Sequence, residues 1–260
     1  QRNYFSRVQD HNDYTEVRVE LIIIFVYGFF LLFILAYSFV QWSLARAYAK
    51  SLKQTAPKVP AMNENEWPTV TVQLPVYNEL YVVERLIDAV AMLDYPSEKL
   101  EIQILDDGND DSVDLARKRA QHWSSKGINI QHIQRSDRSG YKAGALAYGL
   151  SQAKGSFTAI FDADFVPSPD FLRQTIPFLV KDASLGVVQT RWEHLNEGYS
   201  MLTKLQAFGL DAHFSVEQVG RSAKGHFINF NGTAGVWRNE CISDAGGWQF
   251  DTITEDLDLS

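Results

Sequence analysis

Short apolar runs rich in β-branched residues alternate with helix-like segments between residues 69 and 190, and no other feature constrains the fold as strongly. The expected strands are Thr69–Leu74, Leu100–Leu105, Ile128–Ile133, Phe157–Phe161 and Leu185–Thr190. The expected helices are Asn78–Leu93, with Asn78 as its N-cap, then Ser112–Ser124, Tyr141–Ala153 and Asp170–Val180. This alternation predicts a Rossmann-like α/β fold, in which helices cover both faces of a mostly parallel sheet.

A run of twenty residues without a charge, Leu21–Val40, precedes that region. At about 1.5 Å per residue it is long enough to span a bilayer core of about 30 Å, and a buried core helix is the less favoured alternative. We therefore expect a polar segment at 1–20, a transmembrane helix at 21–42, a juxtamembrane linker at 43–66 that begins as a helix, and a folded domain at 67–260. Slightly more Lys and Arg residues follow the span than precede it, which favours a cytoplasmic C-terminal side.

The composition excludes several classes of protein. The chain has 260 residues and a formal net charge of −8, which argues against nonspecific binding to the phosphates of nucleic acids. Cys241 is the only cysteine, so an intrachain disulfide and a zinc site with several cysteine ligands are excluded. Because the chain begins with Gln1 and stops at Ser260 within an acidic, helix-like run, we expect it to be a piece of a longer protein.

Pairs of carboxylates follow two of the expected strands. Asp106-Asp107-Gly108 comes after the second strand, and Asp162-Ala163-Asp164 comes after the fourth. Parallel α/β sheets bind ligands beyond the carboxyl ends of their strands, so these side chains are expected to face a cleft. Carboxylates gathered there repel one another unless a cation or a donor-rich ligand lies among them. The pattern predicts a site for Mg²⁺ or Mn²⁺ and a diphosphate, although an Asx turn before Pro167 would also explain the second pair.

Three further segments could carry chemistry, and two of them have an equally good structural explanation. Arg138–Gly144 places cations and small residues at a helix start, where phosphates bind, but a capped amphipathic helix fits as well. Phe230–Gly235 contains small residues that would let a substrate approach the backbone closely. Thr254-Glu255-Asp256 offers either a general base or the start of a helix cap.

Taken together, these motifs resemble those of family 2 glycosyltransferases with a GT-A fold. In chain order they are Leu74–Glu79 (LPVYNE), Asp106–Gly108 (DDG), Gly140–Leu146 (GYKAGAL), Phe161–Asp164 (FDAD), Phe230–Gly235 (FNGTAG) and Thr254–Asp256 (TED). Each motif is modest alone, but the ordered set over residues 69–260 is specific. The chain looks most like the membrane-embedded, processive synthases of the cellulose synthase superfamily. Within it, the similarity is to the cellulose-synthase-like A and C groups, which make mannan or glucan backbones.

The resemblance implies a role for each motif. The nucleotide-sugar site would contain Pro75, Tyr77, Glu79, Asp106, Asp107, Lys142 and Asp162, with Lys142 on the diphosphate. The metal, Mg²⁺ or Mn²⁺, would be held by Asp162 and Asp164. The acceptor sugar would lie against Asn231, Gly232, Thr233 and Glu255. Asp256 would be the base that deprotonates the acceptor hydroxyl in a single inverting displacement, which gives a β-linkage.

The resemblance also implies partners and a location. The partners are a nucleotide-diphospho-sugar donor (UDP-glucose or GDP-mannose), a growing β-linked polysaccharide and membrane lipid. The location is the cell (inner) membrane, with the catalytic domain in the cytoplasm. A non-processive transferase that adds one sugar to a lipid or carrier is the first alternative, and a catalytically silent scaffold is the second.

The chain departs from the family pattern in one respect. The Gln-x-x-Arg-Trp motif that follows the base in this family is absent, because Gln189-Thr190-Arg191-Trp192 has one residue too few between Gln and Arg and precedes Asp256. We therefore expect the glycosyltransferase domain to be incomplete at its C-terminus.

Overall fold

The computed structural model describes residues 2–54, 57–252 and 254–260, with side chains from residue 18 onward. The chain divides into two compact units. One unit contains the long N-terminal helix together with Ser200–His226, and the other contains the sheet and the remaining described residues.

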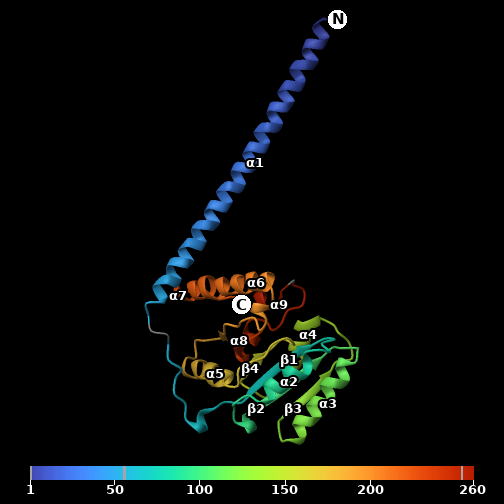
Figure 1. Ribbon diagram of the computed structural model, residues 1–260, viewed down its shortest axis with the longest axis vertical. Helices are drawn as coiled ribbons and strands as arrows, with labels where there is room; N and C mark the ends of the chain where they lie inside the picture. Colours follow the sequence, from blue (N-terminus) through green and yellow to red (C-terminus); the bar gives the residue numbers. More distant parts are fainter. Residues whose placement is uncertain (1, 55–56, 253) are drawn as a thin grey trace. The chain divides into compact units, whose positions relative to one another are not determined.

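The larger unit is built on a six-stranded sheet in the order β3-β2-β1-β4-β6-β5. Figure 1 labels the first four strands of the chain, β1 to β4. The strands are β1 (Val70–Val76), β2 (Leu100–Asp106), β3 (Ile130–Gln134), β4 (Phe157–Ile160), β5 (Val187–Gln189) and β6 (Gly235–Arg238). The first four strands pair in parallel, whereas β6 runs antiparallel to both β4 and β5. The predicted α/β fold with a mostly parallel sheet is confirmed. The five predicted strands are all present, and β6 was not predicted.

Helices cover both faces of this sheet. The helical segments are α1 (Arg2–Ser51), α2 (Val83–Ala91), α3 (Ser112–Ser125), α4 (Tyr141–Leu150), α5 (Phe171–Lys181), α6 (Met201–Ala212), α7 (Gly220–Ala223), α8 (Asn239–Asp244) and α9 (Glu255–Leu259), with 3-10 turns η1 (Glu64–Glu66), η2 (Ser97–Lys99) and η3 (Glu197–Tyr199) and the π-helical η4 (His213–Val219). Of these, α1, α6, η4 and α7 belong to the smaller unit. In the larger unit, helices α2, α3 and α5 share one apolar cluster with the strands, and α4, α8 and α9 share a second. Since successive residues of a strand point to opposite faces, the two clusters lie on opposite sides of the sheet.

Burial on both faces explains the composition of the central strand β1. Val70, Val72 and Leu74 are fully buried, and so are the polar side chains of Thr71 and Gln73 that alternate with them. A buried polar group must find a hydrogen-bond partner. The neighbouring strand β2 supplies both partners: Thr71 Oγ1 donates to Glu101 Oε2 at 2.7 Å, and Gln73 Nε2 donates to Gln103 Oε1 at 3.1 Å.

The helix after β1 begins later than predicted, and Asn78 is not its N-cap. Helix α2 begins at Val83, whereas Asn78 lies in the preceding loop with a positive φ of 58°. Its side chain faces the loop after β2, because Asn78 Oδ1 accepts from the Asn109 N–H at 2.9 Å and Asn78 Nδ2 donates to Asn109 Oδ1 at 3.0 Å. The prediction was wrong because the side chain bridges two loops that are distant in sequence.

The smaller unit contains the apolar N-terminal run. Helix α1 is continuous from Arg2 to Ser51, and its stretch Arg18–Ser51 is long and apolar enough to cross a membrane, with a mean hydropathy of 2.7 over its most apolar window. Within this unit α1 contacts η4 and α7. The approach is close at Gly220, where an added methyl group would lie 2.8 Å from the carbonyl oxygen of Leu44. The expected apolar helix is therefore present and is longer than the predicted span.

Candidate active site

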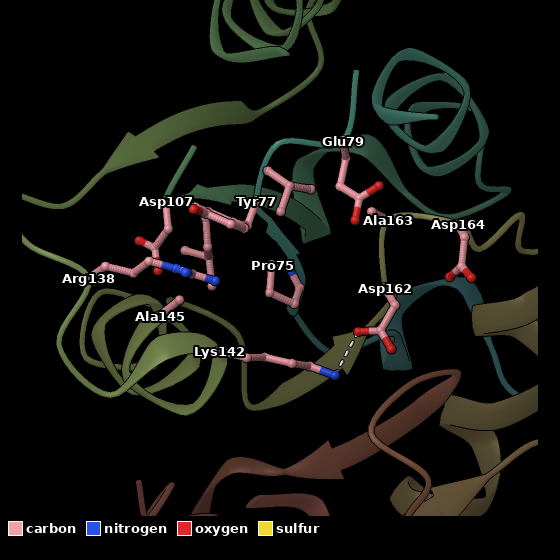
Figure 2. Close-up of a pocket in the computed structure, with 12 residues that line it drawn as sticks. Pro75, Tyr77, Glu79, Asp107, Arg138, Lys142, Ala145, Asp162, Ala163 and Asp164 are labelled. Atoms are coloured by element: carbon pink, nitrogen blue, oxygen red, sulfur yellow. Dashed lines mark ion pairs between the residues drawn. The ribbon is translucent and has the colours of Figure 1, made fainter. Parts of the chain in front are cut away.

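A cavity of about 390 Å³ opens at the carboxyl ends of β1, β2 and β4. It is lined by Pro75, Val76, Tyr77, Glu79, Leu105, Asp107, Arg138, Lys142, Ala145, Asp162, Ala163 and Asp164. In Figure 2 the carboxylates of Glu79, Asp162 and Asp164 lie on one side of this cavity, and Asp107 and Arg138 lie on the other. Most of the predicted nucleotide-site residues are thus brought together from three strand ends and from the start of α4.

Lys142 contacts three other segments of the site through its ammonium group. Its Nζ lies 2.7 Å from Asp162 Oδ1 (Figure 2), 3.1 Å from the carbonyl oxygen of Gly232 and 3.6 Å from Glu255 Oε1. The side chain is only partly exposed, so these interactions are screened less than those of a surface pair. One ammonium group therefore joins the start of α4 to three segments that the sequence analysis singled out separately.

The surroundings of Asp162 disfavour its charge despite that ion pair. Burial raises the pKa of Asp162, Lys142 lowers it, and the carboxylates of Asp164 and Glu255 raise it again. The backbone holds the residue firmly, since the Asp162 N–H donates to Thr233 Oγ1 at 3.0 Å. A second cation near Asp162 would offset the remaining repulsion.

Glu79 experiences the same excess of negative charge. Burial raises its pKa above the usual value of 4.5, and the carboxylates of Asp164, Asp162 and Asp110 raise it further. A group whose pKa is higher in the folded state binds more protons there. Its contribution to stability is therefore complete below the unfolded pKa and is lost as the pH rises through the folded pKa.

Replacing Glu79 by Gln should consequently raise the free energy of unfolding at pH 7, because the substitution removes a charge that the folded state disfavours. It should also flatten the increase in stability as the pH falls toward 4.5. Urea titrations at several pH values measure both effects. The exposed Glu98 on η2 provides the control E98Q. A lower stability of E79Q at pH 7 would show that Glu79 is stabilised rather than repelled in its charged form.

The predicted acceptor segment reaches the site through its backbone. The peptide N–H of Asn231 donates to Gln189 Oε1 at 3.0 Å. Gly232 has a φ of +71°, a backbone conformation that residues other than glycine rarely adopt. A methyl group added to it would lie 3.0 Å from Asp256 Oδ2 and 3.2 Å from Lys142 Nζ. The predicted base and the lysine therefore both pack against Gly232, next to the position that a side chain would occupy there.

Replacing Gly232 by Ala should destabilise the chain by more than the roughly 1–2 kcal/mol that a left-handed conformation costs an L-residue. The added methyl group would also displace Asp256 and Lys142, so activity should fall as well. The matched control is Gly127→Ala, since Gly127 has a φ of +90° and no atom within 4 Å of the added group. Chemical denaturation compares the two variants, and equal losses of stability would mean that crowding at Gly232 contributes nothing.

Asp256 lies on α9 beside this glycine and does not line the cavity. Its Oδ1 accepts from the Leu257 N–H at 2.9 Å, and its main-chain carbonyl accepts from Ser260 Oγ at 2.6 Å. Ser260 Oγ in turn accepts from the Phe230 N–H at 2.8 Å, which ties α9 to the acceptor segment. The side chain thus packs against Gly232, whose carbonyl oxygen accepts from Lys142 Nζ.

The two carboxylates after β2 are placed differently from each other. Asp106 is buried and does not line the cavity, because it lies 2.7 Å from His132 Nε2 and accepts from the Gly108 N–H at 2.8 Å. Asp107 lines the cavity, and both of its oxygens accept from Arg135. The sequence analysis identified neither His132 nor Arg135.

Arg138 completes the wall on this side. Its guanidinium carbon lies 3.3 Å from the centroid of the Tyr77 ring, which is a cation–π contact. The sequence analysis placed Arg138 in a segment suited to phosphates but assigned it no role.

The donor set suits a hard divalent cation bound partly by its substrate. Glu79, Asp162 and Asp164 carry three carboxylates along one side of the cavity, and Lys142 offsets one of the charges. Across residues 2–54, 57–252 and 254–260, no group of three or more His, Cys, Asp or Glu side chains is close enough to hold a metal. Mg²⁺ commonly takes one or two carboxylates and completes its shell with water and substrate phosphates, and Asp162 with Asp164 fits that mode.

Comparison with known proteins agrees with this chemistry. The family model described as "Glycosyl transferase family 2" matches residues 71–239. Glucomannan 4-beta-mannosyltransferase 1 of Oryza sativa subsp. japonica is 43% identical over 205 residues, which cover 77% of this chain and 39% of that protein. Glucomannan 4-beta-mannosyltransferase 7 of Arabidopsis thaliana is 46% identical over 198 residues, covering 75% and 36%. The chain thus spans well under half the length of these relatives.

Two solved structures share the fold. The mannosyltransferase PcManGT from Pyrobaculum calidifontis, in complex with GDP-Man and Mn²⁺, matches with a TM-score of 0.61 and 21% identity over 86% of this chain and 60% of that one. S. aureus TarS matches with a TM-score of 0.54 and 18% identity over 73% and 32%. Together with the mixed six-stranded sheet, these likenesses establish the GT-A architecture that the sequence predicted.

Proposed function

We propose that this chain, which belongs to glycosyl transferase family 2, transfers a hexose from a nucleotide-diphospho-sugar to a growing β-linked polysaccharide. One observation carries the proposal. Lys142 and Asp162 form an ion pair at the carboxyl edge of the sheet, and the same lysine contacts Gly232, against which Asp256 packs. A cation for a diphosphate, carboxylates for a metal and a carboxylate for a proton thus meet around one glycine.

On the donor side, the residues of the cavity divide by charge. Lys142 would bind the diphosphate, and Asp162 with Asp164 would hold Mg²⁺ or Mn²⁺. A bound divalent cation neutralises charge on the leaving diphosphate. Arg138 over Tyr77 and the neighbouring Pro75 would form the wall for the nucleoside, with Glu79 on the opposite side.

On the acceptor side, Asp256 would take the proton of the attacking hydroxyl. The acceptor would lie along Asn231–Thr233, where the absence of a side chain at Gly232 lets a sugar approach the backbone. A base and a leaving group on opposite sides of the anomeric carbon give a single displacement, which inverts the configuration and forms a β-linkage. A methyl group added at Gly232 would lie 3.0 Å from Asp256 Oδ2 and 3.2 Å from Lys142 Nζ, so the proposed base lies close to the proposed ligand of the diphosphate.

We further propose GDP-mannose rather than UDP-glucose as the donor. The relatives that are 43–47% identical over three quarters of the chain are named as glucomannan 4-beta-mannosyltransferases. Helix α1 would anchor the chain in a cell membrane, with the catalytic unit in the cytoplasm. The second enzymatic candidate, transfer of one sugar to a lipid or carrier, would use the same residues.

The test is a donor screen on the full-length protein in membranes, with radiolabelled GDP-mannose and UDP-glucose, each with Mn²⁺, Mg²⁺ or a chelator. We expect metal-dependent incorporation from GDP-mannose into a β-linked polymer, which linkage and length analysis would identify. A product with a single added sugar would favour the non-processive alternative. No transfer and no hydrolysis of either donor would contradict the proposal and favour a scaffold.

A further inference from the structure

The guanidinium of Arg135 lies next to the cavity residue Asp107 and donates four hydrogen bonds to neighbouring protein groups. Arg135 follows the last residue of β3, and its side chain is only 11% exposed. It donates from Nε to Asp107 Oδ1 at 2.9 Å and from Nη2 to Asp107 Oδ2. It also donates from Nη1 to the Ser139 carbonyl at 2.8 Å and from Nη2 to the Tyr141 carbonyl at 3.1 Å. A single guanidinium thus joins the end of β2 to the loop that leads into α4.

The backbone at the junction of that loop with α4 is in an unfavourable conformation at Tyr141. Gly140 has a φ of +71°, and Tyr141, which is not a glycine, has a φ of +49°. Such backbone geometry persists only where the surroundings fix it. The first turn of α4 also closes tightly on the arginine, because a methyl group at Gly144 would lie 2.1 Å from the Ser139 carbonyl oxygen and 2.7 Å from Arg135 Nη1. The hydrogen bonds of Arg135 therefore set the path of the chain immediately before Lys142.

We propose that Arg135 is a positioning residue, which places Lys142 for the diphosphate and Arg138 for the nucleoside by tying the Asp107 carboxylate to the carbonyl groups of Ser139 and Tyr141. The proposal rests on the proposed function, because it assigns the donor-binding cations to this cavity. Arg135 itself does not line the cavity. Lysine cannot replace it, since an ammonium group lacks the planar fork that reaches a carboxylate and two carbonyls at once.

The same contacts define what Asp107 does. Both of its oxygens accept from Arg135, and its side chain is only 6% exposed. The main role of Asp107 is therefore to hold the guanidinium of Arg135, and we treat the two residues as one unit. Residues in one hydrogen-bonded network show non-additive substitution effects, whereas independent contacts with a ligand add.

The first experiment measures the affinity of GDP and of UDP by calorimetry for the whole chain in detergent micelles. Arg135→Lys should weaken binding of the preferred nucleotide by about tenfold or more, since several charge-assisted hydrogen bonds lose their geometry. Arg119→Lys is the matched control. Arg119 makes an equivalent two-pronged pair with Asp88, also partly buried, between α3 and α2 and away from the cavity. It should lower the melting temperature comparably and leave nucleotide affinity unchanged.

The second experiment is a double-mutant cycle with Asp107→Asn. If the two residues are one unit, R135K, D107N and the double variant should weaken binding by a similar factor. Factors that multiply in the double variant would overturn the proposal, as would an R135K affinity equal to that of R119K. If the unsubstituted chain binds neither nucleotide, the proposed function fails with it. If that chain binds and R135K binds equally well, only the positioning role fails.

Discussion

Replacing Asp256 by Asn should lower kcat by about 10²- to 10⁴-fold, the usual contribution of a general base, and should leave donor affinity nearly unchanged. The amide has the shape of the carboxylate but cannot accept the proton of the acceptor hydroxyl. Asp256 does not line the cavity, and the substitution keeps the size and shape of its side chain, so donor affinity should change little. Initial rates at saturating donor, together with calorimetric titration of the donor, separate the two effects.

The neighbouring helix position supplies the control for this prediction. Asp258 is exposed on the same helix α9, and D258N changes the net charge by the same amount. It should keep full activity. If D256N retained more than about a tenth of the rate, Asp256 would not be the base. Glu255, which lies 3.6 Å from Lys142, would then be the next carboxylate to examine.

The sequence was most informative where structure depends on local patterning. Runs such as Phe157–Phe161 are apolar at four of five positions, which is typical of strands buried on both faces. The parallel connections then place the residues after each strand along one edge of the sheet. The sequence therefore predicts that Asp107 and Asp162 share a cleft, and both line the cavity.

The sequence was least informative for a strand that forms only because it pairs with a neighbouring strand. Strand β6 has four residues, Gly235–Arg238, and only Gly235 belongs to the segment Phe230–Gly235 that the sequence pointed to as an approach for substrate. It forms a strand because Ile160 and Phe157 on β4 pair with its two ends. The β-propensities of the residues do not predict such pairing, because it depends on packing against neighbouring strands.

The two acidic residues after β2 show a similar limit. Sequence alone placed Asp106 and Asp107 together, yet only Asp107 lines the cavity, since successive side chains leave a strand in opposite directions. The sheet register contains the signal for Arg135 that the sequence analysis missed. Asp106 and Gln134 are paired and are the last residues of β2 and β3. The residues that follow them, Asp107 and Arg135, are therefore expected to lie opposite each other.

Helix α1 was predicted for its apolar portion and extends beyond it. The rule used was the absence of charge over Leu21–Val40, and that rule ends a span where charges begin. Helices do not end at a charge, because Lys, Arg and Glu are good helix formers. The helix therefore continues without a break to Ser51, so the juxtamembrane helix expected after residue 42 is part of α1 and not a separate element.

Replacing Asp162 by Asn should abolish the metal-dependent part of donor binding. The loss should exceed the roughly 10- to 100-fold that follows from removing only an outer partner of a metal ligand. The substitution takes away one of the two carboxylates proposed for Mg²⁺ or Mn²⁺ and leaves Lys142 with Glu255 as its nearest acid, at 3.6 Å. Calorimetric titration of GDP-mannose with Mn²⁺ and with a chelator measures the effect. Asp94→Asn is the control, since Asp94 pairs with Arg173 and does not line the cavity.

The same variant should not unfold more easily at pH 7, which separates loss of binding from loss of structure. Burial is the largest influence on Asp162 and raises its pKa above the usual 3.8, and the ion pair with Lys142 only partly offsets it. The charged form is thus disfavoured in the folded state, and the contribution of this carboxyl to stability is lost as the pH rises through its folded pKa. D162N should therefore be as stable as the unsubstituted chain or more stable. A lower melting temperature at pH 7 would instead mean that the Lys142 ion pair outweighs the burial and repulsion of the carboxylate.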